Sequence, residues 1–177
     1  MRALADETDV IPCVICGAEL YETDTVAVCS FCGRETPAEY LCPNEHHICE
    51  ECQLAHPLQA VERVCEGTWE TDPGLIVNLI MKHPVMVMHS PYHHVLVAPA
   101  VLAALSNSDQ RSLKSGRLAS AIERTADIPY GVCGTHGECG AAVSVGTLVS
   151  ILTGASYHKD RERSAERISW WWEPGTR

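Results

Sequence analysis

The sequence predicts a small α+β fold in which a cysteine-rich N-terminal module precedes a mainly α-helical domain. Two observations lead to this fold class. Seven of the ten cysteines fall between Cys13 and Cys52. From position 55 onward, apolar residues recur at spacings of three and four, which is the period of half-buried helices. We expect three segments: the module over residues 1–54, the helical domain over 55–156, and a charged, Trp-rich tail over 157–177.

The cysteines of the module occur in pairs. Three pairs have the spacing CxxC, beginning at Cys13, Cys29 and Cys49, and Cys42 precedes the adjacent His46 and His47. A CxxC turn brings two sulfurs close enough for two corners of a tetrahedral zinc site with Zn–S bonds of about 2.3 Å. Disulfides are the alternative. Metal is favoured because the N-terminus is polar and acidic, without the pattern of a secretion signal.

Four ligand pairs provide eight ligands, which fill two closed sites that hold structural Zn²⁺. The expected ligands are Cys13, Cys16, Cys29, Cys32, Cys42, His47, Cys49 and Cys52. Of the two adjacent histidines, His47 is favoured over His46. The pairing stays open, because sequential sites resemble a zinc ribbon, whereas interleaved sites resemble the cross-brace of RING and B-box modules. The β-forming residues within Leu20–Val28 predict a short hairpin between the first two pairs.

Helical periodicity and start signals predict the elements of the second part in order. Asp72 followed by Pro73 is typical of a helix start, and Pro84 ends that helix. The expected helices span 55–66, 73–83, 95–105, 109–126 and 141–153, and the third of these is the central helix. Met86 and Met88 alternate with valines and are expected in a core strand.

A second group of cysteines and histidines lies in the helical part. Cys133, His136 and Cys139 are spaced three apart in a glycine-rich loop that opens a helix of small residues. His89, His93 and His94 lie close together between prolines. We take Cys133, His136, Cys139 and His93 as candidate catalytic residues, with a third metal, an iron–sulfur cluster or a redox cysteine pair as the chemistry. The alternative is that these cysteines are buried fillers.

Charge excludes one class of partner. The chain has a net charge of −10, and residues 1–54 hold eleven Asp or Glu against two Arg. Such a module repels phosphate backbones, so we expect no nucleic acid partner. No apolar stretch reaches the ~18 residues of a membrane span, and we expect a cytoplasmic protein with no membrane partner. The sequence contains neither a GxGxxG motif after a strand nor a P-loop.

The chain resembles the domain of unknown function family 5714. The resemblance is carried by the N-terminal cysteine pairs, by Met88–Pro99 and by Gly131–Gly146, and it spans about Cys13 to Ala155. Members occur in anaerobic archaea and bacteria, alone or attached to methyltransferase-like or radical-SAM domains. The resemblance implies no activity. It suggests a protein partner, such as a methyltransferase-like or corrinoid enzyme.

The sequence therefore predicts a metal-binding accessory or interaction protein with two structural zinc sites. The alternative is a redox or iron–sulfur enzyme that uses Cys133 and Cys139. Whether the chain is an enzyme stays open. A third function, that of a RING-like adaptor, requires an exposed apolar groove on the N-terminal module.

Overall fold

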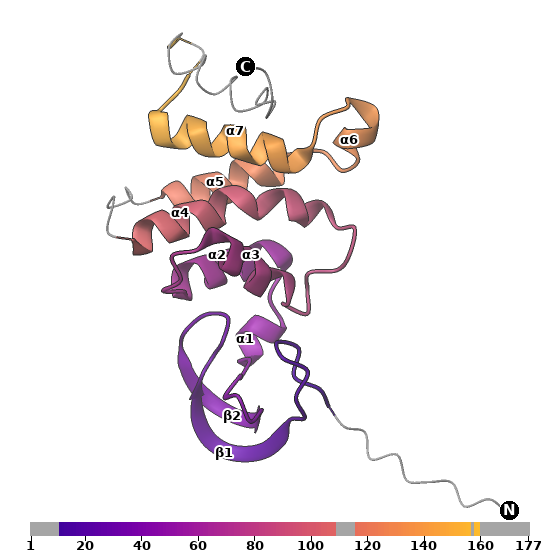
Figure 1. Ribbon diagram of the computed structural model, residues 1–177, viewed down its shortest axis with the longest axis vertical. Coiled ribbons are helices and arrows are strands. Elements are labelled where there is room, and N and C mark those ends of the chain that lie inside the picture. Colours follow the sequence, from indigo (N-terminus) through magenta and orange to yellow (C-terminus); the bar gives the residue numbers. More distant parts are fainter. Residues whose placement is uncertain (1–10, 109–115, 157, 160–177) are drawn as a thin grey trace, which may run out of the picture.

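The computed structural model describes residues 11–108, 116–156 and 158–159. The cysteine-rich module lies at one end, and the helices stack above it in successive layers (Figure 1). Helices α2 and α3 lie next to the module, α4 and α5 form the next layer, and α7 lies farthest away. Apart from residues 158 and 159, the expected Trp-rich tail lies outside the described residues.

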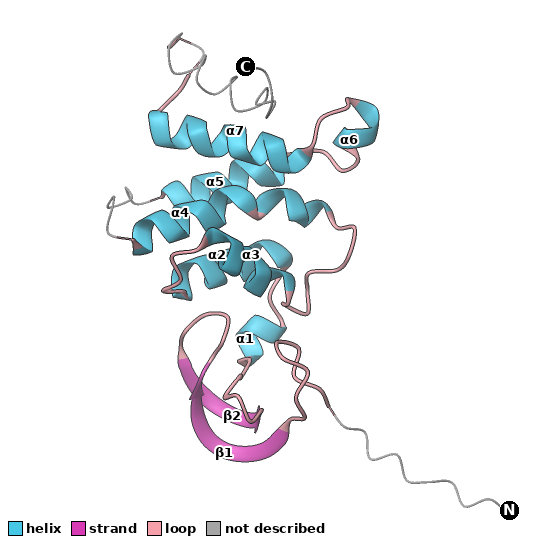
Figure 2. Ribbon diagram, in the orientation of Figure 1, coloured by secondary structure: helices cyan, strands magenta, loops and turns pink. Residues whose placement is uncertain are grey.

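The module contains a two-stranded antiparallel sheet. Strand β1 (Tyr21–Val28) pairs with β2 (Glu35–Leu41) from Tyr21 opposite Leu41 to Val28 opposite Glu35 (Figure 2). The prediction of a hairpin within residues 20–28 was wrong, because this segment is one strand and the second CxxC pair forms the turn. The short helix α1 (Glu50–Gln53) begins directly after Cys49.

The second part is helical, as predicted. Its elements are α2 (Pro57–Gly67), α3 (Pro73–Met81), the 3-10 helix η1 (Pro91–Val95), α4 (Val97–Asn107), α5 (Arg117–Ala126), α6 (Val132–Thr135) and α7 (Gly140–Thr153). Helix α4 contacts α2, α3, α5 and α7, which makes it the central helix. Of the helix predicted over 109–126, residues 109–115 lie outside the described residues.

Local signals explain where two of the helices begin. Asp72 accepts a hydrogen bond of 2.7 Å from the backbone N–H of Gly74, and Pro73 occupies the first helical position. His56 caps α2 and forms a capping box with Gln59. These contacts satisfy backbone N–H groups that have no partner within the helix.

The segment between α3 and η1 differs from the prediction. It forms turns instead of a strand, and the backbone N–H of Met86 donates to the carbonyl of His83 at 2.9 Å. Met86 is buried, whereas 81% of Met88 is exposed. The alternating valines and methionines suggested a strand, but Pro84 sits at the start of the turn and no neighbouring strand is present among the described residues to pair with them.

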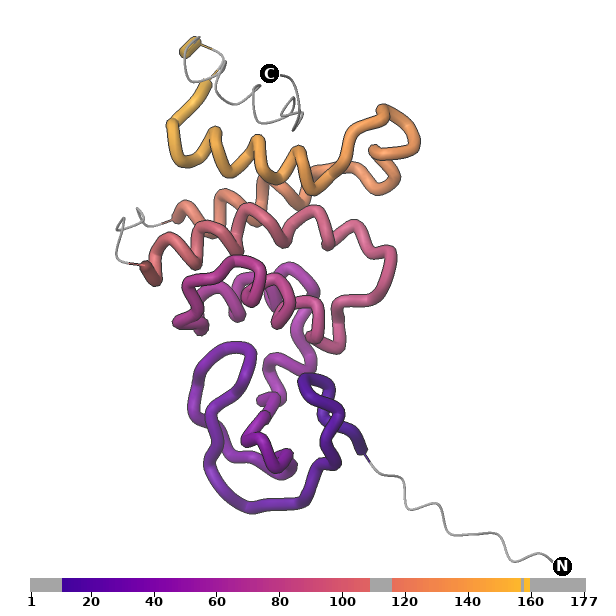
Figure 3. The backbone as a smooth tube through the Cα atoms, in the orientation of Figure 1, coloured from indigo at the N-terminus to yellow at the C-terminus, as the bar shows by residue number. Residues whose placement is uncertain are grey.

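One hydrophobic core joins the module to the helices. Cys29, Phe31 and Cys52 belong to the same buried cluster as Val64 of α2 and Ile80 of α3. The chain path shows how this happens, because the turn of the hairpin and α1 both approach the layer that contains α2 and α3 (Figure 3). The second cysteine pair is thus part of the core. In the described residues, no helix combines the length and the apolar character needed to cross a membrane.

Candidate metal centres

The first candidate site consists of Cys13, Cys16, Cys42 and His46, whose ligand atoms lie within 4.8 Å of one another. The Sγ atoms of Cys16 and Cys42 are 3.8 Å apart. His46 Nδ1 lies 3.3 Å from Sγ of Cys16, 3.4 Å from that of Cys42 and 3.7 Å from that of Cys13. A tetrahedral site with Zn–S bonds of about 2.3 Å and a Zn–N bond of about 2.0 Å has edges of about 3.8 and 3.5 Å. The distances fit one metal ion.

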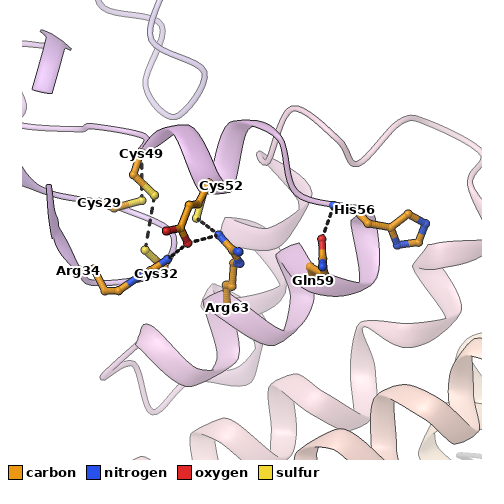
Figure 4. Close-up of polar contacts among 9 residues, drawn as sticks. Cys29, Cys32, Arg34, Cys49, Cys52, His56, Gln59 and Arg63 are labelled. Carbon is orange, nitrogen blue, oxygen red and sulfur yellow. Dashed lines mark hydrogen bonds and ion pairs between the residues drawn. The ribbon is translucent and has the colours of Figure 1, made fainter. Parts of the chain in front are cut away.

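The second candidate site consists of Cys29, Cys32, Cys49 and Cys52. The Sγ atoms of Cys32 and Cys49 are 3.8 Å apart, which again matches a tetrahedral edge. The backbone N–H of Cys49 points at Cys29 Sγ at 3.4 Å, and the guanidinium of Arg63 lies 4.0 Å from Cys52 Sγ (Figure 4). All ten cysteines are free of disulfides.

The two sites are interleaved along the chain. The first cysteine pair joins the third ligand pair, and the second joins the fourth, which is the topology of a cross-brace. The hairpin causes this arrangement. Because Tyr21 lies opposite Leu41, the chain before β1 and the chain after β2 meet at one end of the sheet, and Cys29 and Cys32 lie at the other. The chain then runs back along the hairpin, where the backbone N–H of Ser30 donates to the carbonyl of His47 at 2.8 Å.

The structure places His46, and not the expected His47, in the first site. His47 is 6% exposed, and its ring is occupied by other partners: Nε2 lies 3.0 Å from Oγ1 of Thr36, and Nδ1 lies 3.4 Å from the carbonyl of Tyr40. Glu45 has a left-handed backbone with φ of 61°. The chain turns back there, and both the backbone N–H and the ring of His46 approach Cys42 Sγ. The spacing alone does not distinguish two adjacent histidines.

The environments of the thiols differ. The side chain of Asn44 donates to Cys16, and this bond is the main reason that the pKa of Cys16 falls to about 6. Burial opposes ionisation of Cys32, but hydrogen bonds from the backbone and side chain of Arg34 outweigh it and lower the pKa to about 7. At Cys52, burial prevails and raises the pKa. A buried thiolate of this kind needs a cation beside it, and a divalent metal supplies one.

Charged side chains support the second site from outside. Arg34 forms an ion pair with Glu51, and Arg63 lies 3.2 Å from the same carboxylate. This carboxylate of α1 thus connects Arg34 of the hairpin turn with Arg63 of α2. Figure 4 shows both arginines beside the four cysteines. Arg34 lowers the pKa of Glu51, as expected for an ion pair. Sequence reasoning missed these residues because a pattern of cysteines does not specify what surrounds the ligands.

The sites also differ in exposure. In the first site Cys13 and Cys42 are buried but Cys16 is exposed, and none of the three belongs to the core cluster. In the second site Cys29, Cys49 and Cys52 are buried in that cluster, and Cys32 is partly buried. The second site therefore lies inside the shared core, and the first lies at the surface of the module.

The candidate residues of the helical part lie in a different setting. Cys133, His136, Cys139 and His89 are exposed, and His93 is partly buried. The ring of His94 lies against Gly140, where an added Cβ would be 2.3 Å from it. The two segments that the sequence analysis singled out therefore meet at this point. Within residues 11–108, 116–156 and 158–159, no third set of three ligand-type side chains comes together. The buried atoms His93 Nε2 and His94 Nδ1 have no hydrogen-bond partner in the described part.

Comparison with protein families gives one match. The model of a family of unknown function, DUF5714, matches residues 61–169. The chain belongs to this family. The DUF5714 match contains His89–His94 and Cys133–Cys139 and begins after the metal-binding module, so it does not cover the N-terminal cysteine pairs that were expected to be part of the resemblance. No curated protein and no solved structure matches the chain.

Proposed function

We propose that this chain is an accessory or interaction protein whose N-terminal module is held together by two structural zinc ions and whose function is to bind a partner protein. The observation that carries the proposal is the presence of two complete, interleaved four-ligand sets. A tetrahedral site with four protein ligands has no open position for a substrate. The role of both metals is therefore to hold the backbone in place.

Zinc is favoured over an iron–sulfur cluster by the spacing of the sulfurs. In each site all four ligand atoms lie within 4.8 Å of one another, which fits ligands on a single ion. A cluster places inorganic sulfide and several irons between its cysteines, which pushes the thiolates farther apart. A nitrogen ligand in the first set also suits zinc.

The need for metal follows from the small size of the module. A two-stranded sheet is marginally stable by itself in water, and β1 exposes two valines, with Val26 67% exposed and Val28 52% exposed. Among the described residues of the module, seven apolar residues are buried, and five of them are metal-site cysteines. The other two are Phe31 and Ala38, so few apolar side chains remain to form a core without metal. Metal binding then contributes folding free energy directly.

Metal analysis tests the proposal. The full chain is purified without oxygen, and its content of zinc, iron and acid-labile sulfide is measured together with the number of reactive thiols. We expect two zinc ions per chain and neither iron nor sulfide. Cys16→Ser should remove one zinc ion, and Cys133→Ser, which changes an exposed cysteine outside both sets, should retain both.

Three results would contradict the proposal. Iron with sulfide would favour the redox or iron–sulfur function that the sequence raised for Cys133 and Cys139. Disulfides between the module cysteines, found by mass spectrometry of the non-reduced protein, would remove the basis for zinc. An enzymatic turnover that disappears in Cys139→Ser would overturn the accessory role even if both zinc ions are present.

A further inference from the structure

A groove of about 930 Å³ crosses the metal-binding module. Such a volume is at the upper end of the ~300–1,000 Å³ that is typical of pockets for small ligands. Apolar side chains make up much of its lining, and three of them are well exposed: Ile11 at 52%, Val14 at 46% and Tyr40 at 40%. Exposed apolar side chains that gather around one concave surface mark interaction sites in soluble proteins.

The groove lies between the two metal sites. Cys13 and His46 of the first site and Cys49 of the second all line it. Pro84, from the turn after α3, closes it from the helical part. The neighbouring residue His83 is buried and packs on Phe31 of the hairpin turn, with ring centroids 4.4 Å apart. The shape of the groove therefore depends on both metals and on the contact between the module and the helices.

The carboxylates that line the groove make it acidic. Glu39, Glu50 and Glu51 line it. Glu51 is paired with Arg34 and Arg63, whereas Glu39 and Glu50 are exposed and take part in no ion pair among the described residues. Within the part of the chain that the structure describes, no Lys or Arg lines the groove. Residues 1–54 hold eleven acidic side chains against two arginines, and a divalent ion in a Cys₄ or Cys₃His site leaves further net negative charge on the thiolates. The groove thus repels anions.

We propose that this groove binds a basic peptide segment of a partner protein, in which aliphatic or aromatic side chains are flanked by Lys or Arg. The apolar side chains of the peptide contact Val14 and Tyr40, and its basic side chains pair with Glu39 and Glu50. Electrostatic complementarity selects such a partner against acidic ones and accelerates its association. The inference rests on the proposed function, because both metal sites shape the groove. It adds the surface and the chemistry of the partner.

The probe is a random peptide library displayed on phage, selected on the full zinc-loaded chain. We expect the selected sequences to be enriched in Lys or Arg next to Leu, Ile or aromatic residues. A synthetic peptide of the consensus sequence is then titrated by fluorescence anisotropy. The double variant Glu39→Gln/Glu50→Gln should weaken binding about fivefold, since each exposed ion pair contributes a modest amount. The matched control Glu22→Gln/Asp24→Asn changes two exposed acidic residues of β1 that do not line the groove, and should bind as the wild type does.

The apolar wall is tested separately. Val14→Ser should weaken binding of the same peptide while retaining two zinc ions, which shows that the module is still folded. Removal of zinc with a chelator should abolish binding.

Several outcomes would overturn the groove as the binding site. These are selected peptides that lack basic residues, equal binding of the peptide to both double variants, and equal binding after chelation. Self-association of the chain that is lost in Glu39→Gln/Glu50→Gln, seen by sedimentation, would identify a second copy as the occupant instead. Zinc content separates this proposal from the previous one: two zinc ions without peptide binding contradict only the groove, whereas absence of zinc contradicts the proposed function itself.

Discussion

Gly67, the last residue of α2, lies directly against the backbone of Cys32. A Cβ on Gly67 would be 2.3 Å from the carbonyl carbon and oxygen of Cys32. On the opposite side of this contact, a Cβ on Gly33 would be 2.7 Å from the carbonyl oxygen of Gly67. The second metal site can therefore pack against the helices only because neither Gly33 nor Gly67 carries a side chain.

Replacement of Gly67 should destabilise the protein. Because backbone atoms cannot rotate away as a side chain can, Gly67→Ala should reduce the free energy of unfolding by about 1–3 kcal/mol, the usual cost of overpacking. The measurement is chemical denaturation of the zinc-loaded chain. Gly134→Ala is the control, since a Cβ there meets no atom within 4 Å. Equal stability of the two variants would show that α2 does not press on the hairpin turn.

The two adjacent histidines should behave differently. His46→Ala removes a ligand of the first site, so the chain should bind one zinc ion instead of two. His47→Ala removes hydrogen bonds to Thr36 and to the carbonyl of Tyr40, so it should retain two zinc ions and lose about 1–3 kcal/mol of stability, because two hydrogen bonds of about 0.5–1.5 kcal/mol each are lost. Zinc content and denaturation are measured for both variants. Loss of zinc from His47→Ala alone would contradict the assignment.

A chelator should remove the two metals in separate steps. The first site has the exposed ligand Cys16, whereas the second has three buried cysteines in the shared core. Release from the second site therefore requires opening of the core, and release from the first requires only local opening. We expect a fast and a slow phase of equal amplitude when zinc transfer to a coloured chelator is followed. In Cys16→Ser the fast phase should be missing. A single phase for both metals would contradict the difference in burial.

Stability should fall in alkaline solution because of Cys65. Burial raises the pKa of this thiol from its ordinary value of 9.0 to about 12. The unfolded chain therefore releases this proton first, and the folded state binds more protons between pH 9 and 12. The stabilisation that the buried, protonated Cys65 gives to the folded state is fully present below pH 9. Above pH 9 it is lost at about 1.4 kcal/mol per pH unit. Unfolding free energies at increasing pH should converge for the wild type and Cys65→Ala. Parallel curves would show that Cys65 ionises normally.

The contact between His94 and Gly140 offers a double-mutant test. Gly140→Ala places a Cβ 2.3 Å from the His94 ring, so the ring or the start of α7 must shift, at a cost of about 1–3 kcal/mol. His94→Ala removes the obstacle. In the double variant the effect of Gly140→Ala should largely disappear, which gives a coupling energy of at least about 1 kcal/mol. Additive effects would mean that the two segments do not touch.

Sequence alone determined the class of the fold and most of the candidate metal ligands. Thiolates must be paired with cations when they are buried, so the repeated CxxC spacing in Cys13–Cys52 predicted two metal sites, and both four-ligand groups contain the expected cysteines. The start of α3 was equally predictable, because capping at Asp72 depends on residues that are neighbours in the chain. Local chemistry of this kind does not require knowledge of the fold.

Only the tertiary structure decided how the ligand pairs combine and which histidine joins them. The pairing depends on β1 and β2 lying side by side, and the choice of His46 depends on the reversal at Glu45. The burial of the second site, the groove beside Pro84 and the approach of His94 to Gly140 likewise join residues far apart in the chain. Such contacts arise from long-range packing, and spacing along a sequence carries no information about which distant surfaces meet.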